Sequence, residues 1–165
     1  MTEVRTILNL DEVELEFSSQ GTRFGGADGD IGQTLGLKGL GATLYEVPPG
    51  LAAVPFHRHH TSDEMFIVLQ GTGTYRIGEE RLPIRPGDCL GAPAGGAAHQ
   101  IINTGGEPLR YIALSNNTSA DVIEYVDSGR IRIDVGASGF HREDGTFKAG
   151  GRLMPMDYWE GEDVG

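Results

Sequence analysis

The residue types with metal-binding chemistry are concentrated in two short stretches of this chain. Three of the five histidines fall within four positions, a glutamate follows shortly after them, and a fourth histidine comes about forty residues later. These candidates are His57, His59, His60, Glu64 and His99. Divalent first-row metals prefer imidazole and carboxylate ligands, and a rigid frame that holds a few of them leaves a coordination position open for chemistry. The residue types therefore predict a metal centre, provided that the fold returns His99 to the other candidates.

Strand geometry separates these histidines, because side chains alternate between the two faces of an extended strand. His57 and His59 share parity and are expected to point to one face, whereas His60 is expected to be an exposed or supporting residue. Glu64 follows a connection that is long enough for a hairpin, so its carboxylate can face the two histidines. An unpaired carboxylate would be costly to bury beside the apolar run 65–69, and a metal ion offsets that cost.

Short strands are the elements expected to position these residues. Glycine supplies 26 of the 165 residues, roughly double its average usage of about 7%. Glycine and proline separate apolar runs at intervals of about eight to twelve residues, and no amphipathic stretch between them suits a helix. The expected strands span residues 42–47, 52–59, 64–69, 72–77, 81–85, 89–92, 98–103, 109–115, 122–126 and 131–135. The pattern predicts an all-β sandwich or barrel and argues against a βαβ fold. The side chains expected to fill it include Tyr45, Phe56, Phe66, Tyr75 and Ile101.

The length of the chain is sufficient for one domain with a core. Residues 41–135 are expected to form the barrel. Residues 1–40 look irregular and glycine-rich, and we expect them to form an arm that packs on the barrel or on a neighbouring subunit. Residues 136–165 are expected to be a C-terminal extension. Tyr158 and Trp159 are expected to anchor this tail, on their own chain or across a dimer, and His141 is expected to be a solvated loop residue.

The excess of acidic over basic residues argues against two classes of binding partner, nucleic acids and membranes. The formal net charge is −11, and such a surface repels phosphate backbones and anionic membrane surfaces. We therefore expect neither nucleic-acid binding nor membrane binding. The N-terminus lacks the apolar stretch of a secretory signal, and the single cysteine cannot form an internal disulfide, which together favour a cytoplasmic location. Cys89 is expected to be a small buried residue at the start of a strand.

Two ordered motifs resemble those of the cupin superfamily, the small barrels with a double-stranded β-helix fold. The first reads Gly50 … His57-Arg58-His59 … Glu64 … Gly71, and the second reads Gly87 … Pro93-Ala94-Gly95 … His99 … Asn103. The resemblance covers residues 41–115, with one extra residue after Gly50 and another before His99. A bulge or a longer turn at 96–98 is expected to absorb the second and to keep His99 on the pocket face. A longer pattern, formed by residues 93–104 together with Asp121, Tyr125 and Ser128-Gly129, is similar to a subgroup of single-domain bacterial cupins often labelled sugar-phosphate isomerases.

The resemblance implies that His57, His59, Glu64 and His99 are metal ligands, which are the same four residues that the side-chain chemistry suggests. The ion would be divalent, and the ligand set does not decide between Zn, Mn, Fe and Ni. Such a site, with positions open, can act as a Lewis acid or bind dioxygen. Glu64 is also the candidate base of a catalysed reaction.

We therefore expect a metal-binding, single-domain cupin that takes a small polar metabolite into its barrel, with sugar-phosphate isomerase-like activity as the first hypothesis. An Fe-dependent dioxygenase is the second hypothesis, and a non-catalytic small-molecule binding or sensor protein is the third. A basic residue at the barrel mouth would favour an anionic substrate. A homodimer is expected because exposed sheet edges need to be paired or covered.

Overall fold

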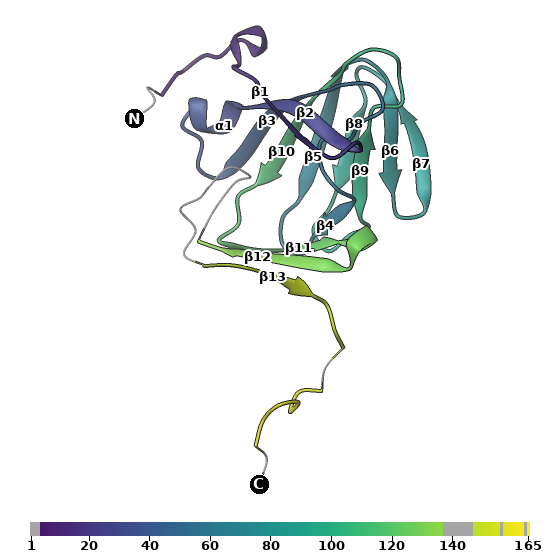
Figure 1. Ribbon diagram of the computed structural model, residues 1–165. Coiled ribbons are helices and arrows are strands. Elements are labelled where there is room, and N and C mark those ends of the chain that lie inside the picture. Colours follow the sequence, from purple (N-terminus) through teal and green to yellow (C-terminus); the bar gives the residue numbers. More distant parts are fainter. Residues whose placement is uncertain (1–3, 137–146, 156, 164) are drawn as a thin grey trace.

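The computed structural model of this chain describes residues 4–136, 147–155, 157–163 and 165. The described part consists mainly of β-strands, arranged as two antiparallel sheets that face each other in a double-stranded β-helix (Figure 1). The predicted all-β barrel is therefore confirmed. His141 lies outside the described residues. No helix in the described part of the chain is long and apolar enough to cross a membrane.

The two sheets draw their strands from distant parts of the chain. Within the described residues, the first sheet has the order β1-β2-β3-β10-β5-β8 and the second has the order β13-β12-β11-β4-β9-β6-β7. The strands of the first sheet are β1 (Glu16–Gln20), β2 (Phe24–Asp30), β3 (Leu40–Val47), β5 (Glu64–Gln70), β8 (Cys89–Ala92) and β10 (Leu109–Asn116). The strands of the second sheet are β4 (His57–His59), β6 (Gly73–Ile77), β7 (Glu80–Ile84), β9 (His99–Ile102), β11 (Ala120–Tyr125), β12 (Arg130–Val135) and β13 (Phe147–Arg152). Three short helices, η1 (Leu10–Glu12), α1 (Ile31–Thr34) and η2 (Val126–Ser128), connect or precede strands.

The N-terminal region is more regular than the arm expected from the sequence. Strands β1 and β2 extend the first sheet beyond β3. Strand β2 is rich in glycine and lacks the alternating apolar side chains by which a strand is recognised, so its conformation depends on pairing with β3. A Cβ atom at Gly29 would lie 2.4 Å from the carbonyl oxygen of Glu14. The glycine therefore allows the segment before β1 to pack closely on β2.

Two further expectations about strands are corrected by the structure. Of the expected strand 52–59, only the last three residues form β4, because Pro55 has no amide hydrogen to donate and Ala52 makes only isolated bridges. Cys89 is exposed rather than buried. It begins the edge strand β8, in which the side chain of Ala92 rather than that of Cys89 reaches the core.

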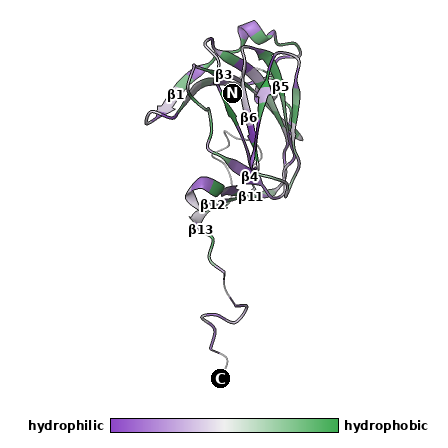
Figure 2. Ribbon diagram, turned by 90° about the vertical axis from the view of Figure 1, so that its right-hand side faces the viewer, coloured by the Kyte–Doolittle hydropathy of each residue, from purple (hydrophilic) through white to green (hydrophobic). Residues whose placement is uncertain are grey.

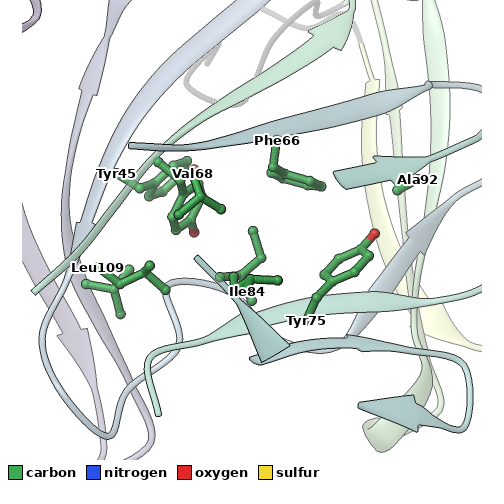
Figure 3. Close-up of a cluster of buried hydrophobic side chains, with 10 residues drawn as sticks. Tyr45, Phe66, Val68, Tyr75, Ile84, Ala92 and Leu109 are labelled. Atoms are coloured by element: carbon green, nitrogen blue, oxygen red, sulfur yellow. The ribbon is translucent and has the colours of Figure 1, made fainter. Parts of the chain in front are cut away.

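The hydrophobic core fills the space between the two sheets (Figure 3). Its largest cluster contains Tyr45, Val47, Phe66, Val68, Tyr75, Ile84, Ala92, Ile101, Leu109 and Tyr111. All five side chains that we expect to fill the barrel are buried, and four of them lie in this cluster, whereas Phe56 is buried outside it. The ring of Phe66 lies 5.5 Å from the ring of His99, measured between centroids. The core therefore supports one wall of the candidate metal centre directly.

Asn103, the last residue of the second motif, fastens a turn rather than facing the metal candidates. Its side chain is completely buried. The amide nitrogen donates to the carbonyl oxygens of Val47 and Glu107 at 2.7 and 2.8 Å, and the amide oxygen accepts from the backbone of Gly105 at 3.0 Å. These bonds hold the turn before β10 against the end of β3, so this motif residue stabilises the barrel.

Candidate metal centre

Three strands from both sheets bring the candidate ligands together. His57 and His59 lie on β4, and His57 is the direct pairing partner of His99 on the neighbouring strand β9. Glu64 begins β5 in the opposite sheet. Its Oε2 atom lies 3.6 Å from Nε2 of His57, 3.4 Å from Nε2 of His59 and 2.9 Å from Nε2 of His99. The fold thus gathers three imidazole nitrogens around one carboxylate oxygen.

A turn before β9 accommodates the extra residue between Gly95 and His99, so His99 keeps its place beside the other candidate ligands. Gly95 has a φ of 68°, a left-handed conformation that glycine adopts without strain. Its backbone nitrogen donates to the carbonyl oxygen of His59 at 2.8 Å, and that of Gly96 donates to Pro93 at 2.9 Å. These bonds close the turn and fasten it to β4. The strand then starts at His99 with the register that faces the cluster.

The cluster has the properties of a cation site. One ligand atom each from His57, Glu64 and His99 lies within 4.8 Å of the others. Among the described residues, Oε2 of Glu64 and both ring nitrogens of His99 are buried without a hydrogen-bond partner, although Oε2 and Nε2 lie only 2.9 Å apart. Buried polar atoms without partners are rare and costly. A divalent ion would satisfy these atoms, and His59 would add a fourth donor.

Hydrogen bonds on the far side of two rings orient them toward the cluster. Nδ1 of His57 donates to the carbonyl oxygen of Pro55 at 2.8 Å, and Nδ1 of His59 is hydrogen-bonded to the carboxylate of Asp121. Because each Nδ1 carries the proton, each Nε2 presents a lone pair. Asp121 also accepts from the hydroxyl and the backbone nitrogen of Thr61, at 2.8 and 3.2 Å.

Asp121 is a residue of the site to which the sequence assigned no role. It lies 62 positions from His59, and only the antiparallel pairing of β11 with β4 brings the two together. No local motif marks such a partner. His60, in contrast, lies as expected from its parity: it is exposed, and its ring approaches Glu124 at 3.3 Å on the other face.

The electrostatic environment favours the metal-binding forms of Glu64 and His99 at neutral pH. Burial alone would raise the pKa of the Glu64 carboxyl, but contacts with His57 and His99 outweigh it, and the pKa lies far below its usual range. Burial holds the pKa of His99 below its ordinary value, which favours the neutral ring. For His59, burial is outweighed by the hydrogen bond to Asp121, which raises the pKa of the ring. Metal ions bind the ionised carboxylate and the neutral imidazole, so Glu64 and His99 are already in that form.

A cavity of about 160 Å³ opens beside the cluster. His57, His59 and Glu64 line it, whereas His99 lies behind them and is 3% exposed. Arg132 is the cation among the described residues of the lining, and its Nε atom pairs with the carboxylate of Asp134 at 2.8 Å. Other polar groups in the lining come from Asp30, Thr43, Tyr45, Ser62, Ser115, Asn116, Asn117, Thr118, Asp121 and Tyr125. The cavity therefore suits a small polar molecule that reaches the candidate ligands.

The sequence of this chain matches known proteins over its central part. The family model described as "Cupin domain" matches residues 43–115. An uncharacterised protein of Methanocaldococcus jannaschii is 32% identical over 47% of this chain and 62% of its own length. This chain thus spans less than two thirds of that relative.

Solved structures match over a larger share of the chain. A protein of Acidithiobacillus ferrooxidans, provisionally assigned as a sugar phosphate isomerase, is 27% identical with a TM-score of 0.73, covering 79% of this chain and 86% of that one. A sugar phosphate isomerase from a cupin superfamily, of Silicibacter pomeroyi, is 23% identical with a TM-score of 0.75, covering 96% of both chains. The second likeness shows the fold alone. The family model thus identifies residues 43–115 as a cupin domain, and the double-stranded β-helix of the described residues agrees with that assignment.

Proposed function

We propose that this protein is a metal-dependent enzyme acting on a small polar metabolite, and that its reaction is the isomerisation of a sugar phosphate. The observation that carries the proposal is the convergence of His57, His59, Glu64 and His99 beside a polar cavity. The similarity to the Acidithiobacillus protein supports the choice of reaction. These four side chains would hold a divalent ion, which when bound polarises a substrate carbonyl as a Lewis acid.

Two other residues of the cavity, Tyr45 and Arg132, can bind the substrate, and Glu64 is better suited to bind the metal than to act as a base. Burial raises the pKa of Tyr45 well above its usual value, so its hydroxyl keeps its proton and can donate to a substrate oxygen. Arg132 supplies a planar, permanently charged donor that suits a phosphate group. Glu64 has too low a pKa for an efficient general base, because a base acts best with a pKa near the working pH. Its environment favours a metal ligand over the catalytic base suggested by the sequence.

The first experiment measures the metal content of protein purified without added metal, by elemental analysis. His57→Ala removes one candidate ligand, and His60→Ala is the matched control, because His60 is exposed and faces away from the cluster. We expect one equivalent of a divalent metal in the wild type and in His60→Ala, and a large loss in His57→Ala. A metal content near zero in the wild type, even after incubation with metal ions, would refute the metal centre.

The second experiment tests the reaction with a panel of aldose and ketose phosphates in deuterated water, followed by NMR. Isomerisation by proton transfer between adjacent carbons is expected to introduce solvent deuterium at one of them. Arg132→Gln is expected to raise KM for phosphorylated sugars while the metal content stays unchanged. Iron in the site with substrate-dependent oxygen consumption would instead support a dioxygenase. Tight ligand binding without turnover would support a binding or sensor protein.

A further inference from the structure

A second and larger hollow lies outside the barrel, and positive side chains surround it. This groove has a volume of about 790 Å³ and runs beside β12, β13 and η2, with the start of β2 on its other side. Four of the 13 lysine and arginine residues of the chain line it, namely Arg23, Arg130, Arg132 and Lys148. Its one carboxylate among the described lining residues, Asp127, is already held by two bonds from Arg76. Cations are thus concentrated here on a chain whose net charge is −11.

The groove also has an apolar floor. Phe24, Phe56 and Ile131 line it beside the cations. The guanidinium of Arg23 lies 5.8 Å from the centroid of the Phe24 ring. A ligand for this surface would therefore combine negative charge with an apolar or aromatic part.

The C-terminal tail of the chain has this combination. The segment 153–165 carries Asp157, Glu160, Glu162 and Asp163, and it contains no lysine or arginine. Its Tyr158 and Trp159 side chains are 82% and 60% exposed, so they do not anchor the tail on their own chain, which leaves the expectation that they anchor it across a dimer. In two perpendicular views the tail leaves the end of β13 and leads away from the barrel (Figures 1 and 2). Large aromatic side chains exposed together with other apolar residues mark an interaction site.

We propose that this tail docks in the cationic groove of a second copy of the chain, so that two copies exchange tails in a symmetric dimer. The four carboxylates of the tail face a groove lined by four cations, of which Arg132 is already paired with Asp134, and the aromatic pair packs on Phe24 and the guanidinium groups. Two copies of this acidic chain repel each other over most of their surfaces because both carry a net negative charge. In the groove, the cations instead attract the acidic tail of the other copy. Each copy places its tail in the groove of the other, so both tails and both grooves are occupied. Such a reciprocal contact produces a closed dimer with a twofold axis.

Trp159 is the single tryptophan of the chain, so its fluorescence reports on the tail alone. The donor protein carries Arg23→Glu and Arg130→Glu, which disable its own groove and leave the shared cavity residue Arg132 intact. The recipient carries Trp159→Phe and an intact groove, and it therefore has no tryptophan fluorescence. Mixing the two is expected to shift the donor emission to shorter wavelength in a saturable way. A recipient with Trp159→Phe and both groove substitutions is the matched control and is expected to cause no shift.

Reversing the charges of the tail provides a control for misfolding, because substitutions in the tail leave the barrel unchanged. For this test the donor keeps Arg23 and Arg130, so that its own groove repels a cationic tail. Glu160→Lys and Glu162→Lys in this donor are expected to weaken docking of its tail on the intact recipient roughly tenfold. The same donor is expected to regain binding to a recipient that carries Arg23→Glu, Arg130→Glu and Trp159→Phe. The wild-type chain is expected to have a dimeric mass by light scattering, and added salt should dissociate it.

Three outcomes would overturn the proposal. The first is an unchanged emission on mixing, or equal shifts with the intact and the disabled recipients. The second is a wild-type chain of monomeric mass whose Trp159 emission is already blue-shifted at every concentration, which would place the tail in its own groove. The third is a monomeric wild type with a solvent-exposed Trp159, which would leave the tail for a different partner.

Discussion

Asp121→Asn tests whether a carboxylate outside the ligand set controls metal binding through His59. The substitution keeps the shape of the side chain and its ability to accept from Nδ1, but it removes the negative charge. A hydrogen bond to a charged group contributes about 1.5–3 kcal/mol, against about 1 kcal/mol for a neutral one. The difference of about 1–2 kcal/mol corresponds to metal binding that is roughly 5- to 30-fold weaker. The carboxylate side chain is only 13% exposed, so solvent screening reduces this value little.

The assay is competition for Zn²⁺ between metal-stripped protein and a chromophoric chelator at neutral pH. Thr61→Val is the matched control, because it removes the 2.8 Å hydroxyl contact to Asp121 and leaves the carboxylate on His59. We expect its affinity to fall by a few-fold at most. Thermal unfolding without metal checks that both variants are folded. Wild-type affinity in Asp121→Asn, or an equal loss in Thr61→Val, would refute the orienting role of this carboxylate.

Four further perturbations test the barrel and the site. Asn103→Ala should lower the free energy of unfolding by about 2–4 kcal/mol, since it removes three hydrogen bonds at a buried position; a change below about 0.5 kcal/mol in urea unfolding would contradict this reasoning. Leu109→Ala should cost about 2–5 kcal/mol with an unchanged urea m-value, because the side chain is fully buried in the main cluster. A divalent metal at a concentration of 100 times its Kd should stabilise the wild type by about 2.7 kcal/mol in thermal melts, and should not stabilise His57→Ala. The hydrogen bonds from Arg76 lower the pKa of Asp127, so their contribution is present above the unfolded-state pKa near 3.9 and is lost as the pH falls through the folded-state value. Because Asp127 is half exposed, Asp127→Asn should cost less than about 1 kcal/mol at pH 7 and nothing in strong acid; an undiminished difference in acid would argue against the ion pair.

The central barrel was predictable because its signals are local. Turn glycines and prolines delimit strands wherever they occur, and alternation fixes which side chains share a face. That rule alone placed His57 and His59 together and set His60 apart, as the structure has them. Strand β1 and the glycine-rich strand β2 carry no such alternation. Strand β2 forms because β3 offers an edge to pair with, and β1 pairs in turn with β2.

Only the tertiary structure decided which residues that are far apart in the chain lie next to each other. The pairing of β11 with β4 sets Asp121 behind His59. The fold brings the start of β2 to the groove that β12 and β13 line, and so places Arg23 and Arg130 together, which the sequence presents as two scattered charges. The sequence by itself determined most strands of the central barrel and the ligand types, because backbone alternation and side-chain chemistry are properties of neighbouring residues. Which distant carboxylate orients a ring, and where charge accumulates, depends on strand order and register, and these are fixed only when the two sheets close around their core.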